Sequence, residues 1–180
     1  MNHYPFWVPD YDRVRDHTSE YPNVSKIFKH PTSFWYGQRG GKPIKNLTKR
    51  INRLFARAGD CLPVFVCYNL PNRDMGHYSK GGGKTANDYL DFIEDFANGI
   101  GDRKPIVIYE PDGLPHTTVM SKYEADKRLD MMLNATYLLA HKCKARIYID
   151  VGHSNWLEPE EVGTLLNKFN VDRIPGFSCN

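Results

Sequence analysis

Two carboxylates, Glu110 and Asp112, stand directly after an apolar run, in the stretch IVIYEPDG (106–113). Two further carboxylates, Asp74 and Asp150, follow or end other apolar runs. Carboxyl groups that lie close together cannot all ionise cheaply, so one of them keeps its proton and can act as a general acid near neutral pH. Cleavage of a glycosidic bond needs a protonated carboxyl of this kind at the leaving oxygen. Helix capping and salt bridging are the structural alternatives for the same acids.

Other chemistries find less support in the sequence. His153 with Asp74 and Asp150 could hold a metal ion, although a single His after a strand is more often a hydrogen-bonding group. The run SKGGGKT (79–85) resembles a phosphate-binding loop, but Tyr78 stands where the first glycine is required. Three adjacent glycines also suit a mobile flap. The chain has no nucleophile elbow G-x-S-x-G and no dinucleotide fingerprint G-x-G-x-x-G.

The elements that must position these residues alternate between short apolar runs and amphipathic helical patterns. Strands are predicted at 32–37, 63–70, 105–110, 145–150 and 174–180, and helices at 43–58, 85–101, 121–141 and 159–169. Apolar strands each followed by a helix are typical of a parallel sheet covered by helices. The pattern leaves open a β/α barrel and an open doubly wound sheet. In both, ligands bind at the carboxyl ends of the strands, where Asp74, Asp112 and Asp150 are predicted to lie.

Composition predicts one domain and excludes several classes of protein. The 180 residues are 41% hydrophobic, enough for one sizeable core. The net charge is +3 and the basic residues are scattered, which disfavours a nucleic-acid surface. The four cysteines lie far apart, without a C-x-x-C pair. No signal peptide and no membrane span is visible, so localisation stays open and no membrane partner is expected.

Four motifs resemble successive strand-end motifs of glycoside hydrolase family 6, the inverting cellulases and cellobiohydrolases. They read VFVCYNLPNRDMGHYSKGGG (64–83), IVIYEPDGL (106–114), YIDVGHSNWL (148–157) and GFSCN (176–180). The resemblance runs from about Phe6 to Asn180. It implies an α/β fold, namely a distorted, TIM-like parallel β/α barrel. It also implies hydrolysis of β-1,4-linked glucan such as cellulose with inversion. No cofactor or metal is expected.

The same resemblance implies roles for residues near the scissile bond. Asp112 matches the proton donor, and Asp74 matches the carboxylate that raises the pKa of the donor. Tyr68 matches a tyrosine at the distorted sugar, and Ser79 matches a serine on a mobile loop that helps to hold the water. Trp35 resembles a sugar platform on the non-reducing side.

Further matches concern the flanks of the site. His153 and Trp156 resemble the subsite beyond the scissile bond, and exposed aromatic rings at such positions stack on sugars. Arg73 matches an arginine beside the acid pair. Asp150 matches a structural or substrate-contacting acid.

The resemblance also implies a domain that spans 1–180 and is truncated at its C-terminal end. About five β/α units are readable, whereas an eight-unit barrel typically needs about 250 residues. The family's candidate base would lie beyond residue 180. An open strand edge would leave inward apolar groups such as Phe177 exposed, and would favour self-association or completion by a second chain. A carbohydrate-binding or vestigial half-barrel and one part of a split enzyme are therefore alternatives to an active hydrolase.

Overall fold

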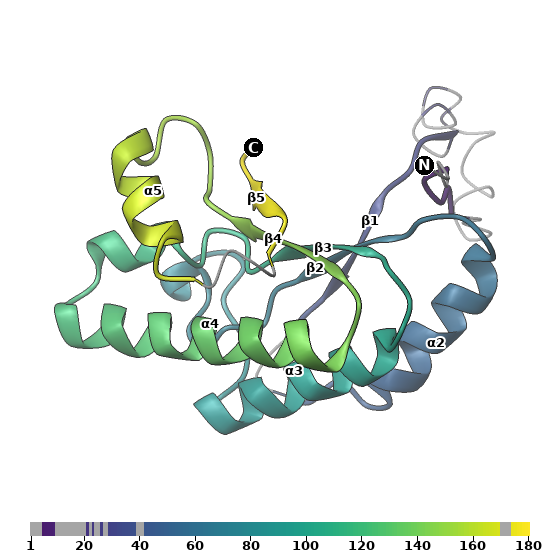
Figure 1. Ribbon diagram of the computed structural model, residues 1–180, viewed down its shortest axis with the longest axis horizontal. Coiled ribbons are helices and arrows are strands. Elements are labelled where there is room, and N and C mark those ends of the chain that lie inside the picture. Colours follow the sequence, from purple (N-terminus) through teal and green to yellow (C-terminus); the bar gives the residue numbers. More distant parts are fainter. Residues whose placement is uncertain are drawn as a thin grey trace.

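The protein folds into a five-stranded sheet flanked by helices, as the computed structural model in Figure 1 shows. The structure describes residues 5–9, 21, 23, 26, 29–38, 42–169 and 174–180. The strands are β1 (Ser33–Tyr36), β2 (Val64–Cys67), β3 (Ile106–Tyr109), β4 (Arg146–Asp150) and β5 (Gly176–Ser178). The helices are α2 (Leu47–Ala58), α3 (Ala86–Ile100), α4 (Lys122–Lys142) and α5 (Pro159–Leu166), with short 3-10 turns η2 (Asp74–Gly76) and η3 (Pro115–Val119).

The strand order decides between the two architectures that the sequence leaves open. All five strands are parallel and lie in the order β1-β2-β3-β4-β5, so each strand pairs with the next strand in the sequence. A doubly wound sheet reverses its order at a switch point, whereas a barrel wall runs in one direction. The fold is therefore a barrel-type β/α arrangement of five units, as predicted. Helices α2, α3 and α4 cover one face of this curved sheet (Figure 1).

Local signals set the ends of the helices. Capping boxes start α3 at Thr85 and α4 at Ser121, because each side chain accepts the backbone N–H three residues on. The expectation that Pro43 opens α2 is wrong. The helix starts at Leu47 instead, because Asn46 has a left-handed backbone with φ 57°, which helical residues do not adopt. Helix α5 ends at Leu166, three residues earlier than predicted.

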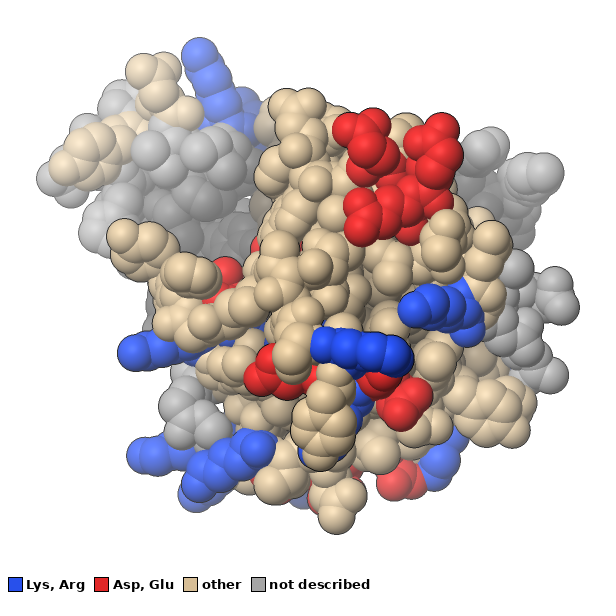
Figure 2. Space-filling model, turned by 90° about the vertical axis from the view of Figure 1, so that its left-hand side faces the viewer, with Lys and Arg blue, Asp and Glu red and all other residues tan. Residues whose placement is uncertain are grey.

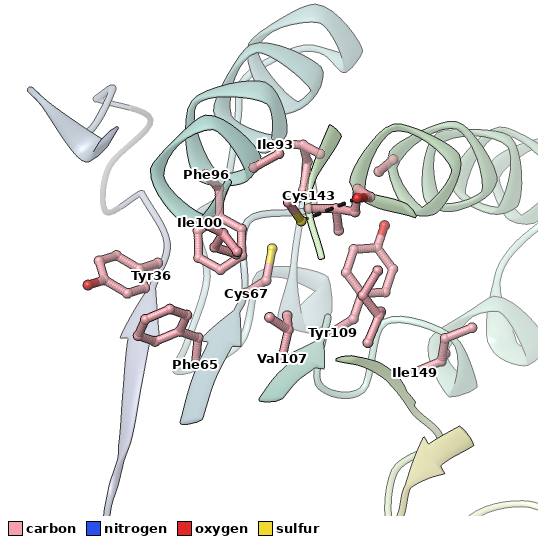
Figure 3. Close-up of a cluster of buried hydrophobic side chains, with 14 of the residues drawn as sticks. Tyr36, Phe65, Cys67, Ile93, Phe96, Ile100, Val107, Tyr109, Cys143 and Ile149 are labelled. Atoms are coloured by element: carbon pink, nitrogen blue, oxygen red, sulfur yellow. Dashed lines mark hydrogen bonds between the residues drawn. The ribbon is translucent and has the colours of Figure 1, made fainter. Parts of the chain in front are cut away.

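The hydrophobic core lies between the sheet and helices α2–α4. Alternate strand residues supply it, such as Phe65 and Cys67 of β2 and Val107 and Tyr109 of β3, all fully buried. Figure 3 shows these side chains pointing toward the helices, where Ile93, Phe96 and Ile100 of α3 meet them. The packed face explains why the strands read as apolar runs and fixes the carboxyl ends of β1–β4 relative to one another.

The opposite face of the sheet is less covered. Trp35, Val66, Ile108 and Tyr148 share one row of the strand register on this face, and Trp35 is 61% exposed. Phe177 is 54% exposed. The expectation that its side chain points into the interior of the barrel is wrong. It pairs in register with Ile149, whose side chain is buried on the helix-facing side, so Phe177 points to that side as well.

The charged surface shows no single basic patch on the face seen in Figure 2. Basic side chains there are scattered among uncharged and acidic ones, and acidic side chains gather at one place. Within the described part of the chain, no helix is long and apolar enough to cross a membrane. That the protein binds neither nucleic acid nor membrane stays a prediction.

Candidate active site

The carboxyl ends of β2, β3 and β4 carry the three aspartates that the sequence singles out. Asp74 lies in η2 after β2, Asp112 follows β3, and Asp150 ends β4. Of the six non-glycine residues described with a left-handed backbone, five lie at this rim: Asn72, Asp74, Met75, Glu110 and Asp112. Such conformations cost free energy and concentrate at functional sites, so their clustering marks the rim as the candidate site.

Asp112 sits in a tight turn directly after β3. Its φ is 62°, and its backbone N–H donates to Asp150 Oδ1 at 2.9 Å. Burial raises the pKa of Asp112, and the negative charges of Asp150 and then Asp74 raise it further, while His153 opposes the shift. A carboxyl with a raised pKa keeps its proton to higher pH, which is the property that a general acid needs.

Asp150 organises the rim rather than facing open solvent. It is 6% exposed, and its Oδ1 accepts the backbone N–H groups of Asp112 and Gly152, both at 2.9 Å. Its Oδ2 accepts the hydroxyl of Ser178 in β5 at 2.9 Å. These three bonds give Asp150 a structural position between β3, β4 and β5. It also contributes more than Asp74 to the raised pKa of Asp112, whereas the resemblance implied this role for Asp74.

Arg73 and Asp74 shape the loop after β2. Arg73 donates from Nε to Ser79 O at 2.7 Å and from Nη1 to Tyr68 O at 2.5 Å. Its guanidinium also lies 4.6 Å from the centroid of the Tyr68 ring. Asp74 Oδ2 accepts the backbone N–H of Ser79 at 2.7 Å. Arg73, Asp74 and Ser79 thus form one hydrogen-bonded unit beside Tyr68.

A groove of about 480 Å³ runs past this unit and is lined by Trp35, Tyr68, Arg73, Tyr78 and Ser79 among others. Trp35 presents much of its ring to solvent and meets the Tyr68 ring edge-to-face at 5.7 Å. Burial raises the pKa of Tyr68 to about 12, with the charges of Asp74 and Asp112 adding to the shift, so this phenol stays protonated. An exposed indole beside a neutral phenol suits a sugar ring, which offers an apolar face and hydroxyl groups.

The glycine-rich run is packed against the rim. Gly82 donates its N–H to Gln38 O at 3.2 Å, and Gly83 donates to Asn69 O at 2.9 Å. At Gly82, φ is 87°, and an added Cβ would lie 1.9 Å from Leu70 O. The glycines therefore permit close backbone contact here, in addition to any freedom that a flap would need.

Trp156 and His153 form a second aromatic group, after β4. Their rings lie 5.3 Å apart, and Trp156 also packs edge-to-face on His116 of η3 at 5.0 Å. Gly152 makes room for the indole, since an added Cβ there would lie 2.7 Å from Trp156 Cε3. His153 is exposed and Trp156 is half-buried, so His153 is the more accessible to a ligand.

Sequence reasoning missed the contributions of His116 and Arg128 to the site. Arg128 reaches from α4 and donates from Nη2 to the carbonyl oxygens of Pro71 and Asn72, at 3.3 and 3.0 Å. His116 is buried, and burial lowers its pKa, with the nearby Arg128 charge adding to the effect. No sequence pattern marks His116 or Arg128 as a site residue. Glu110, by contrast, is visible in the sequence as an acid at the end of an apolar strand.

The described residues do not support a metal site at His153, Asp74 and Asp150. Among the described residues, no three His, Cys, Asp or Glu side chains lie together in a way that could hold a metal ion. Asp150 already accepts three hydrogen bonds, and His153 Nδ1 accepts the N–H of Asn155 at 3.3 Å. These side chains are therefore engaged with the protein itself.

Comparison with known proteins agrees with this geometry. The family model for glycosyl hydrolases family 6 matches residues 9–180. Endoglucanase 1 of Streptomyces halstedii is 34% identical over 123 residues, which cover 67% of this chain and 38% of that protein. Endoglucanase A of Cellulomonas fimi is 32% identical over 162 residues, which cover 87% of this chain and 34% of that protein.

A solved structure extends the comparison to three dimensions. The endoglucanase Cel6 of Mycobacterium tuberculosis, solved in complex with a methyl-cellobiosyl-4-deoxy-4-thio-β-D-cellobioside, superposes with a TM-score of 0.88 at 30% identity. The match covers 100% of this chain and 63% of that one, so the chain spans less than two thirds of the relatives that it matches. The family match over most of its length, together with the shared fold, shows that this chain belongs to glycosyl hydrolases family 6.

Proposed function

We propose that the protein acts on β-1,4-linked glucan and hydrolyses it with inversion, with Asp112 as the general acid. The observation that carries the proposal is the environment of Asp112: a partly buried carboxyl whose pKa is raised by burial and by two neighbouring aspartates. The names of the endoglucanase relatives and the thio-cellobioside in the solved relative support a glucan as the ligand.

Each neighbour of Asp112 has a role in this proposal. The Asp150 carboxylate accepts the backbone N–H of Asp112 and so fixes the turn that carries Asp112. Asp74 adds negative charge beside Asp112 and orients Ser79 by accepting its backbone N–H. Trp35 and Tyr68 offer the groove in which a sugar ring stacks. Protonation of the leaving oxygen by Asp112 would break the bond as water attacks from the opposite face of the sugar. The assigned residues supply the acid for this step, and none of them is assigned as the base.

A second function, glucan binding without turnover, is favoured by the groove itself, where the exposed ring of Trp35 meets Tyr68 edge-to-face. It uses the same groove and needs no base. A protein that forms one part of a split enzyme would behave in the same way when alone.

Product release from a soluble cellulose derivative tests the proposal. The proposed enzyme releases reducing ends, and NMR of the fresh products shows the α-anomer, the inverted configuration. Binding of cello-oligosaccharides without release would favour the second function. Absence of both would reject the glucan proposal.

A further inference from the structure

Glu110 lies where the backbone hydrogen bonding between strands β2 and β3 ends. Beyond this point its side chain, rather than its backbone, hydrogen-bonds the chain that follows β2. The last backbone bond runs from Glu110 N–H to Cys67 O at 2.8 Å. Beyond it, the Glu110 carboxyl accepts the backbone N–H of Asn69 at 3.0 Å and that of Leu70 at 3.1 Å. These N–H groups are buried and would otherwise lack a partner after the ladder ends. The glutamate thus ties the start of the Tyr68–Asp74 loop to β3.

Asn69 carries this connection further around the rim. Its Oδ1 accepts the backbone N–H of Gln38, after β1, at 2.7 Å. Its backbone oxygen accepts the N–H of Gly83 at 2.9 Å. Through one fully buried asparagine, the Glu110 carboxyl therefore supports the end of β1 and the glycine-rich run as well as the loop after β2.

The same glutamate also packs beneath the turn of Asp112. Its backbone oxygen accepts the N–H of Gly113 at 2.9 Å. Gly113 fits so closely that an added Cβ would lie 2.8 Å from Leu70 Cδ1 and 3.1 Å from Glu110 Cβ. The loop that bears Asp74 and the turn that bears Asp112 thus both contact Glu110.

The backbone hydrogen bonds of Glu110 can be kept when its carboxyl is neutral. Glu110 Oε2 accepts both backbone N–H groups, and the Asn69 N–H is shared between Oε1 and Oε2 at 3.0 Å to each. The Cys67 thiol also lies 3.6 Å from Oε1. A neutral carboxyl can keep Oε2 as the accepting oxygen and turn its O–H toward the thiol or the Tyr89 hydroxyl. The hydroxyl groups of Tyr89 and Tyr109 are hydrogen-bonded at 2.6 Å, and the Tyr109 hydroxyl donates to Met132 O at 3.2 Å. The Tyr89 hydroxyl can therefore orient its proton either toward Glu110 or toward Tyr109.

The surroundings of Glu110 disfavour its charge. Burial raises the pKa of Glu110 to about 7, although four hydrogen-bond donors oppose the shift. The titratable and charged groups that face it or feel its charge come from every neighbouring element, and they are Cys67, Tyr68, Tyr89, Tyr109 and Arg128. Of these only Arg128 is a cation, and its Nη2 donates hydrogen bonds to the carbonyl oxygens of the loop after β2.

We propose that Glu110 is a positioning residue: in its neutral form it fixes the loop of Tyr68, Arg73 and Asp74 against the turn of Asp112. When Glu110 ionises, the buried charge loosens this junction. The rim would therefore bind its ligand best below neutral pH. What the rim binds rests on the function proposed above, whereas the positioning can be tested without it.

Amide NMR across a pH titration tests the positioning directly. The amides of Asn69 and Leu70 should titrate with a midpoint near 7, the pKa of Glu110. The amides of Ser79 and Asp112 bond to other carboxylates, and they should show a step at the same midpoint because the junction moves. Glu110→Gln, a permanently neutral isostere, should abolish all four steps. The control Glu124→Gln, at the start of α4 away from the rim, should keep them.

Ligand binding supplies the second measurement. The affinity of the wild-type protein for cellotetraose should fall roughly fivefold or more as the pH rises through 7, the usual scale of coupling between two sites. Glu110→Gln should hold its affinity. Titration steps confined to the amides of Asn69 and Leu70 would mean that Glu110 has only a local structural role, and would overturn the proposal. Equal pH profiles of affinity in wild type and Glu110→Gln would overturn it as well. If no form binds cellotetraose, the proposed glucan function fails, and the amide steps of the wild-type protein alone decide the positioning.

Discussion

Burial of Glu110 makes the protein less stable as the pH rises, and Glu110→Gln should remove this dependence. In the folded protein burial raises the pKa of Glu110 from 4.5 to about 7, whereas the unfolded chain ionises near the ordinary value. Between these two values the folded state binds the extra proton, so its stability falls with increasing pH. The contribution is complete below pH 4.5 and is lost once the pH exceeds about 7.

The size of the effect follows from the two pKa values. At 1.36 kcal/mol for each pKa unit, the difference between 4.5 and about 7 corresponds to about 3 kcal/mol of unfolding free energy. Glu110 is fully buried, so solvent screening does not reduce this figure. A change of about 3 kcal/mol is a large part of the stability of a domain.

Urea unfolding at several pH values between about 4 and about 8 measures this change. The stability of the wild-type protein relative to Glu110→Gln should fall by about 3 kcal/mol across this range. The control Glu124→Gln should differ from wild type in the opposite sense. Hydrogen bonds from Ser121 lower the pKa of Glu124, so its contribution is present at neutral pH and lost on acidification. Parallel curves for wild type and Glu110→Gln would refute the reasoning.

Three further substitutions probe the rim. Trp35→Ala should weaken cello-oligosaccharide binding by roughly 1 kcal/mol in calorimetric titration and leave the melting temperature nearly unchanged, because the ring is 61% exposed; a large fall in melting temperature would mean that Trp35 serves the core. Gly82→Ala should lower the melting temperature sharply because its Cβ would lie 1.9 Å from Leu70 O, whereas the control Gly59→Ala meets nothing within 4 Å and should cost only backbone strain. Asp150→Asn should lower the pKa of Asp112, since a repelling charge is gone, and move the alkaline limb of the activity profile to lower pH; an unmoved limb would count against the coupling.

Apolar patterning was sufficient to predict the strands and most helices. Phe65, Val107 and Ile149 belong to runs that are buried against helices, and burial of that kind leaves a strong sequence signal. The sequential strand order was not readable from the pattern alone, because both candidate folds alternate strands and helices. The start of α2 was missed because a left-handed Asn46 outweighed the usual preference for Pro in the first turn.

The site was predictable only in part. The positions of Asp74, Asp112 and Asp150 at strand ends follow from the apolar runs before them. The direction of Glu110 does not, because strand alternation points it away from the helices, and only its φ of 50° turns its carboxyl toward Cys67. The bond from Ser178 to Asp150 joins residues far apart in the sequence, so no local pattern predicts it.

Asp112→Asn tests the central claim most directly. The asparagine keeps the shape of the side chain and has no proton to transfer, so hydrolysis of unactivated β-1,4-glucan should fall on the order of a hundredfold or more. A cellobioside with a highly acidic leaving group needs little protonation, so its hydrolysis should fall far less. This contrast between the two substrates is the predicted result. Wild-type rates of glucan hydrolysis in Asp112→Asn, or equal losses on both substrates, would contradict the assignment of Asp112 as the general acid.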